Sequence, residues 1–63
     1  MRAVFMKYLN KATDKPEVVA LASTDNHTHS TAQLLEHAAK ILRGKIERGE
    51  LEEKHIYEVN LRN

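Results

Sequence analysis

The stretch Ser30–Gly49, STAQLLEHAAKILRGKIERG, decides the fold of this 63-residue chain, because it is long and periodic enough to be read as a helix. The Ser30 hydroxyl is placed to cap the N-terminus, and Gln33, three residues later, completes a capping box. Gly49 suits the left-handed position that follows a last helical turn. These signals predict a helix over about residues 31–48.

The predicted helix is amphipathic. At about 100° per residue, its apolar side chains fall within one half of the circumference, and charged side chains occupy the other half. Gly44 interrupts the segment, but Ile46 keeps the apolar phase beyond it, so we expect one continuous helix. The half expected to pack against the rest of the domain holds Ala32, Leu34, Leu35, Ala38, Ala39, Ile41, Leu42 and Ile46.

Three further segments have the composition of strands, over about residues 2–9, 17–24 and 55–62. The first is apolar on both sides, which is typical of a central strand. Turn residues and a proline fill 10–16, so the first two strands are expected to form a hairpin. The element order is therefore β-β-α-β.

The strand pattern predicts one small α+β domain over residues 1–63, with a three-stranded, mainly antiparallel sheet packed on one helix. Pairing the third strand with the first gives the spatial order 2-1-3 and keeps the doubly apolar first strand in the middle. The alternative is a parallel crossover beside the second strand, which would leave that apolar strand on an edge.

One helix can cover only one face of such a sheet. The side predicted to face the helix holds Val4, Met6, Tyr8, Tyr57, Val59 and Leu61. Mixed apolar character on the remaining face is typical of an interface, so we expect a homodimer joined through that face or through an exposed edge strand. The candidate partner-binding residues of the second face are Ala3, Phe5, Lys7, Leu9, Ile56 and Glu58, with Asn60 beside them.

Composition narrows the function. The chain has no cysteine, which excludes disulfides, thiolate metal sites and a cysteine nucleophile. Its formal net charge is +1, so there is no global field to attract nucleic acid or an anionic membrane. No apolar run has the roughly 20 residues needed to span a bilayer, and no signal peptide is recognisable. The sequence predicts a cytoplasmic protein with no membrane partner.

A polar stretch before the helix carries the residues closest to a chemical site. Asp25, His27 and His29 are weak candidates for metal ligands, since imidazole and carboxylate bind zinc or nickel. Their spacing is more typical of solvated loop residues. The neighbouring hydroxyl residues match no nucleophile elbow. We therefore expect no bound metal, no cofactor and no catalytic residue.

Basic residues in the second half of the helix and along the first strand give the main alternative, nucleic-acid binding, with Lys40, Arg43, Lys45 and Arg48 as the candidate residues of the helix. Glutamates lie among them, and Phe5 and Tyr8 point to opposite sides of their strand instead of forming a stacking platform. The function predicted from the sequence is thus that of a non-catalytic accessory or regulatory protein that binds another protein.

Overall fold

The elements of the fold follow the predicted order β-β-α-β. The structure is a computed structural model that describes residues 1–25 and 29–62. Within those residues the chain forms three strands, one α-helix and a short 3-10 helix. They are β1 (Arg2–Asn10), β2 (Lys15–Thr24), α1 (Thr31–Glu47), the 3-10 turn Glu53–His55 and β3 (Ile56–Arg62).

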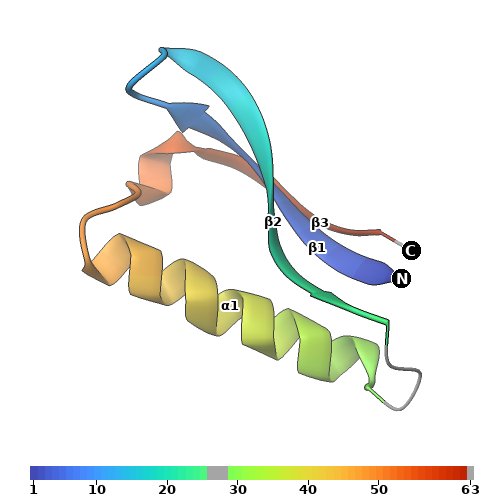
Figure 1. Ribbon diagram of the computed structural model, residues 1–63. Coiled ribbons are helices and arrows are strands. Elements are labelled where there is room, and N and C mark those ends of the chain that lie inside the picture. The colour runs from blue at the N-terminus through green and yellow to red at the C-terminus, as the bar shows by residue number, and fades with distance from the viewer. Residues whose placement is uncertain (26–28, 63) are drawn as a thin grey trace.

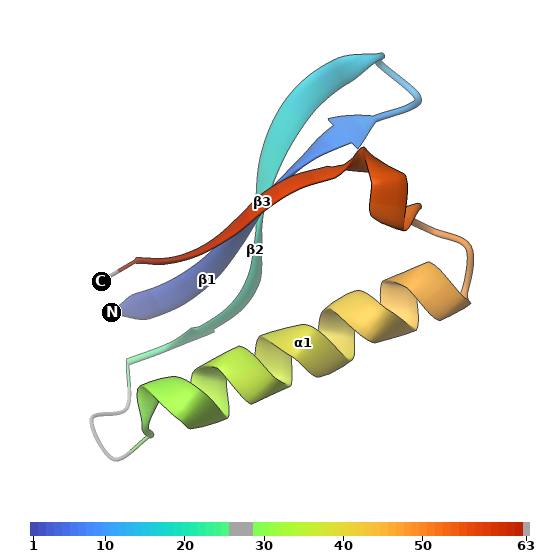
Figure 2. The same ribbon diagram turned by 180° about the vertical axis from the view of Figure 1, so that it is seen from behind.

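The sheet has the predicted order β2-β1-β3, and β1 is antiparallel to both neighbours. The two outer strands therefore run parallel to each other on either side of β1. The sheet is strongly twisted, and α1 lies along one face of it (Figure 1). In the view from behind, α1 again lies on the same side of the sheet, and no α-helix of the described residues lies on the other side (Figure 2).

Both ends of α1 are fixed by the local chemistry that the sequence indicated. The Ser30 side chain accepts a hydrogen bond from the Gln33 amide at 3.1 Å, and the Gln33 side chain accepts one from the Ser30 amide at 2.8 Å. At the other end, the Gly49 amide donates to the Ile46 carbonyl at 3.1 Å and the Glu50 amide to Lys45 at 2.9 Å. With Gly49 at φ +77°, this is a Schellman ending.

The β1–β2 turn is shorter than predicted. Pro16 already pairs with Leu9, so β2 begins two residues before the expected position at 17. The Asp14 amide closes the turn on the Asn10 carbonyl at 2.7 Å, and Asp14 itself has φ +57°, a conformation that Asp tolerates better than most residues. Proline is compatible with β2 because β2 is an edge strand.

The core lies under β1 and β2, because α1 contacts those two strands and barely reaches β3. This makes the buried stripe of the helix narrower than predicted. Leu34 and Ala38 are buried, whereas Ala32, Leu35 and Ala39 are exposed. The buried cluster consists of Val4, Met6, Leu21, Ala22, Leu34 and Ala38.

Two β-bulges change which face some residues occupy. In β2 the extra residue is Leu21, and both Leu21 and Ala22 are buried as a result. In β3 the extra residue is Tyr57, so Ile56 pairs with Tyr8 and packs against the core. Ile56 was predicted from the sequence to lie on the sheet face turned away from the helix. That prediction is wrong, because the extra residue Tyr57 reverses the in–out alternation for the residues of β3 that precede it.

Replacing Gly44 by alanine is expected to stabilise the protein by up to about 1 kcal/mol, because α1 runs through Gly44 and alanine costs less backbone entropy in a helix. A Cβ there would lie 3.0 Å from an Arg48 guanidinium nitrogen, the mobile end of a side chain that can move aside. Urea unfolding measures the change. The matched control is Gly49→Ala, which should lose about 1 kcal/mol because of its positive φ. A destabilised Gly44→Ala would show that the helix is not continuous there.

Arg48→Ala is expected to raise the pKa of Glu50 back toward its usual value. The hydrogen bond from Arg48, together with its charge, holds the pKa of the exposed Glu50 carboxyl below the ordinary range. A lowered folded-state pKa adds stability above the unfolded carboxyl pKa, and this contribution is lost as the pH falls through the folded-state pKa. An NMR pH titration measures the change. Glu52 is the internal control, because Lys54 lowers the pKa of Glu52 and the substitution at Arg48 should leave that pKa unchanged. An unmoved Glu50 would contradict the pairing.

Candidate interaction surfaces

The sheet face turned away from α1 forms a continuous shallow surface, which we call the open face. The register places residues of all three strands in rows across it, with Lys7 between Val18 and Glu58, and Phe5 between Ala20 and Asn60. Val18 is 63% exposed and Phe5 is half-buried. The hollow in this face is lined by Phe5, Lys7, Val18, Glu58, Asn60 and Arg62.

The structure brings together three of the predicted partner-binding residues, Phe5, Lys7 and Glu58. Ala3 is in register with this face, opposite Ser23 and Arg62, but is almost fully buried. Leu9 follows further along β1 and is half-buried. Only Ile56 is removed from the predicted set, since it lies on the helix side.

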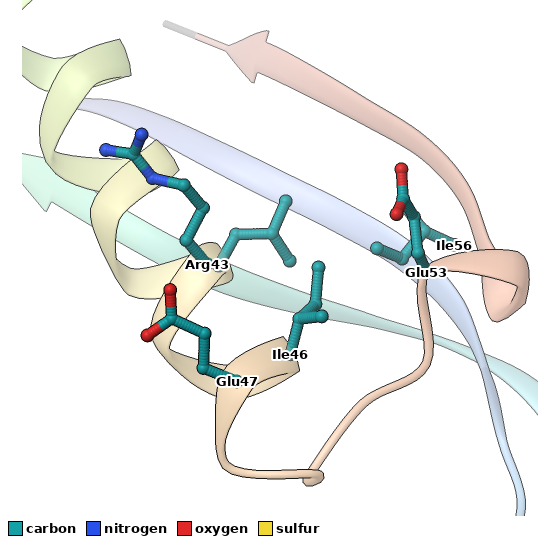
Figure 3. Close-up of a pocket in the computed structure, with 6 residues that line it drawn as sticks. Arg43, Ile46, Glu47, Glu53 and Ile56 are labelled. Carbon is teal, nitrogen blue, oxygen red and sulfur yellow. The ribbon is translucent and has the colours of Figure 1, made fainter.

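A second apolar surface lies between α1 and β3, and we call it the flank groove. Ile46 and Leu42 from the helix approach Ile56 at the start of β3, with Glu47 and Glu53 at the rim (Figure 3). Further along the strand, Val59 is 44% exposed and Leu61 is 37% exposed, although their partners Met6 and Val4 are buried. On the sheet face that α1 covers, the part formed by β3 is therefore left exposed.

The four basic residues of the alternative nucleic-acid surface do not share one side of the helix. Arg43 lines the flank groove, as do Glu47 and Glu53. Lys45 lies at the other flank, half-buried near Met6 and Val19. Lys40 is exposed, and Arg48 pairs with Glu50. Their charges are divided between two flanks and partly neutralised.

Two of the three predicted metal ligands, Asp25 and His29, lie where β2 leads into α1. His27 is outside the described residues. The His29 Nδ1 lies 3.0 Å from the Thr24 Oγ1, and Asp25 is an exposed carboxylate 3.8 Å from the N-terminal amine. His29 and His37 border the same hollow. Among residues 1–25 and 29–62, no group of three or more His, Cys, Asp or Glu side chains could hold a metal ion.

Arg2 fixes the start of α1 to the sheet. Its guanidinium donates to the Thr31 hydroxyl at 3.0 Å and to the His29 carbonyl. Both partners lie at the start of α1, so the first strand holds the helix N-terminus in place.

Sequence reasoning missed Val18 and Arg62 on the open face, and it missed the flank groove. The position of Val18 follows from the register of the β1–β2 hairpin, in which Val18 is opposite Lys7. That register can be assigned from the sequence only if the length of the turn is known. Arg62 has the parity of Glu58 and could have been assigned to that face from the alternation of β3.

Comparison with known proteins gives no further information about these surfaces. No family model, no curated protein and no solved structure matches this chain. Along the described ranges 1–25 and 29–62, no helix has the length and apolar character required to cross a bilayer.

Proposed function

We propose that this chain is a non-catalytic accessory or regulatory protein that acts by binding another protein through the open face. The observation that carries the proposal is the uncovered sheet face, with Phe5 at its centre and Val18 63% exposed beside it. An antiparallel sheet often has one solvated face, but exposed apolar side chains surrounded by polar ones on such a face are typical of an interaction site.

The chemistry of the open face supports a protein partner. Protein interfaces combine an aromatic or apolar centre with a polar rim, and aromatic anchors contribute much of the binding energy. Here Phe5 and Val18 are the apolar side chains, and Lys7, Glu58 and Arg62 supply charges of both signs beside them. A partner that fits this face presents an apolar protrusion with mixed charges at its edge.

A non-catalytic role is supported by where the titratable groups lie. Catalytic acids and bases are usually buried groups whose pKa is strongly shifted. Within the described part of the chain, no polar or charged residue is buried. The two described carboxyls with a clear pKa shift, Glu50 and Glu52, are exposed and owe the shift to surface cations.

Nucleic-acid binding has weaker support. Phosphate contact needs several cations on one surface, whereas Arg43 and Lys45 lie on opposite flanks of α1. On the open face, Glu58 stands directly opposite Lys7, and Arg62 lies further along β3 opposite Ala3. The mixed charges of the open face therefore favour a protein partner over a polyanion such as a nucleic acid.

Photo-crosslinking tests the open face directly. A benzoyl-phenylalanine at position 18 is expected to crosslink one defined protein in the native host, identified by mass spectrometry. The same group at exposed position 32, on α1, provides the matched control. Equal yields from both positions, or an adduct removed by nuclease, would refute a protein site on the open face.

The Val18→Glu variant shows whether the captured protein binds specifically. It is expected to lose at least tenfold in competition against the crosslink, because a charge enters the apolar centre of the interface. Its fold should be kept, since residue 18 is exposed and stands opposite Lys7, which can pair with the new carboxylate. Ala32→Glu is the matched substitution and should compete as well as the unmodified chain. If Val18→Glu competes equally well, the crosslinked protein is not bound at this face.

A further inference from the structure

We propose that two copies of this chain associate through the outer edges of β3, so that the two sheets join into one six-stranded sheet of order 2-1-3-3-1-2. The pairing is antiparallel about a two-fold axis that passes through Asn60. This interface lies along the outer edge of β3 and shares Glu58 and Arg62 with the open face, but it does not depend on the function proposed for that face.

β3 is the more available of the two edge strands. The edge strands of β-sheets are commonly protected from pairing with another chain by proline, by bulges or by a covering element. β2 has Pro16 near its start and the Leu21 bulge within it, and α1 packs over it. In β3 the extra residue, Tyr57, lies near the start, and Glu58–Arg62 is a regular segment that α1 hardly covers.

Charge complementarity selects the register. With Asn60 opposite Asn60 of the second copy, Glu58 stands opposite Arg62 of that copy, and the symmetry produces the same pair twice. Glu58 and Arg62 lie on the same face, and opposite charges in direct cross-strand positions stabilise a strand pair. The Asn60 side chain donates to Glu58 within the chain, and the carboxylate keeps acceptor sites for Arg62 of the second copy. The neighbouring register would place Glu58 opposite Asn60 and form no ion pair.

The same register aligns apolar side chains on the helix face. Val59 pairs with Met6 within the chain and would meet Leu61 of the second copy, which pairs with Val4 of its own β1. Exposed Val59 and Leu61 thus become the middle of two apolar rows that cross the whole sheet. No substitution or rearrangement of the strand is required for this.

The accessible surface area of the chain is larger than expected for a globular protein of its mass, as it would be if part of its surface were covered by a second copy. Its accessible surface is 4646 Å², whereas about 4,100 Å² is expected for a globular chain of 7.2 kDa. A two-fold axis perpendicular to the sheet places both helices on one side and both open faces on the other. Association through β3 therefore doubles the open face as it protects the edge.

Charge reversal tests the register on the purified chain. Sedimentation equilibrium of the unmodified protein should give twice the 7.2 kDa chain mass as its concentration rises to millimolar. Arg62→Glu should weaken the dimer by at least about tenfold, since Glu58 then faces Glu in both symmetric pairs. Glu58→Arg should do the same with arginines. The doubly reversed chain, Glu58→Arg with Arg62→Glu, should recover the dimer.

Mixing the two single variants provides the matched control for folding. Neither should pair with itself, but an equimolar mixture should form a heterodimer, because every cross-strand pair then joins opposite charges. Circular dichroism confirms that each variant is folded. Arg62→Glu is the safer variant, because its partner on β1 is Ala3, whereas Arg at 58 stands opposite Lys7.

Three outcomes would overturn the proposal: a monomer at every concentration, dimers unaffected by either single reversal, or no heterodimer in the mixture. Should Glu58→Arg fail to fold, isotope-filtered NMR of the unmodified protein decides instead. A contact between the side chains of Val59 and Leu61 of the second copy is expected, because directly opposite side chains of a strand pair are neighbours, and its absence from a dimer rejects the register. Val18→Glu lies on the far edge strand and should leave the dimer intact, so this test and the test of the open face fail separately.

Discussion

The constraint on which the rest of this structure depends is that one helix must serve a three-stranded sheet. α1 is 17 residues long and packs over β1 and β2, where its Leu34 and Ala38 complete the buried cluster. Among residues 1–25 and 29–62 no helix lies over the second face of the sheet, and even on the first face α1 stops short of β3. Both candidate surfaces result from this shortage of covering elements.

The elements fixed by local chemistry are those that the sequence predicts well. The capping box of Ser30 and Gln33 and the glycine ending at Gly49 depend only on residues a few positions apart, and the structure forms both. The order 2-1-3 was also predictable, because β1 is apolar on both sides and belongs in the middle. On the open face, Phe5, Lys7 and Glu58 were identified from alternation alone.

The features that could not be predicted depend on pairing between distant segments. A bulge leaves no distinct signature in β3, where Ile56 and Tyr57 both suit either face, so simple alternation misplaced Ile56. The width of the buried helical stripe is likewise decided by where the helix sits on the sheet. Leu35 and Ala39 have the right phase for burial, but a helix displaced toward β2 leaves them exposed.

The bulge at Tyr57 separates two demands made on β3. Ile56, before the bulge, is turned toward Ile46 and closes the core at the end of the helix. The regular segment after it keeps Val59 on the helix face and Glu58 on the open face. A strand without the extra residue would have to place Ile56 with Glu58 and leave the helix end without its apolar neighbour. The bulge thus lets one short strand complete the core and still present an unbroken edge.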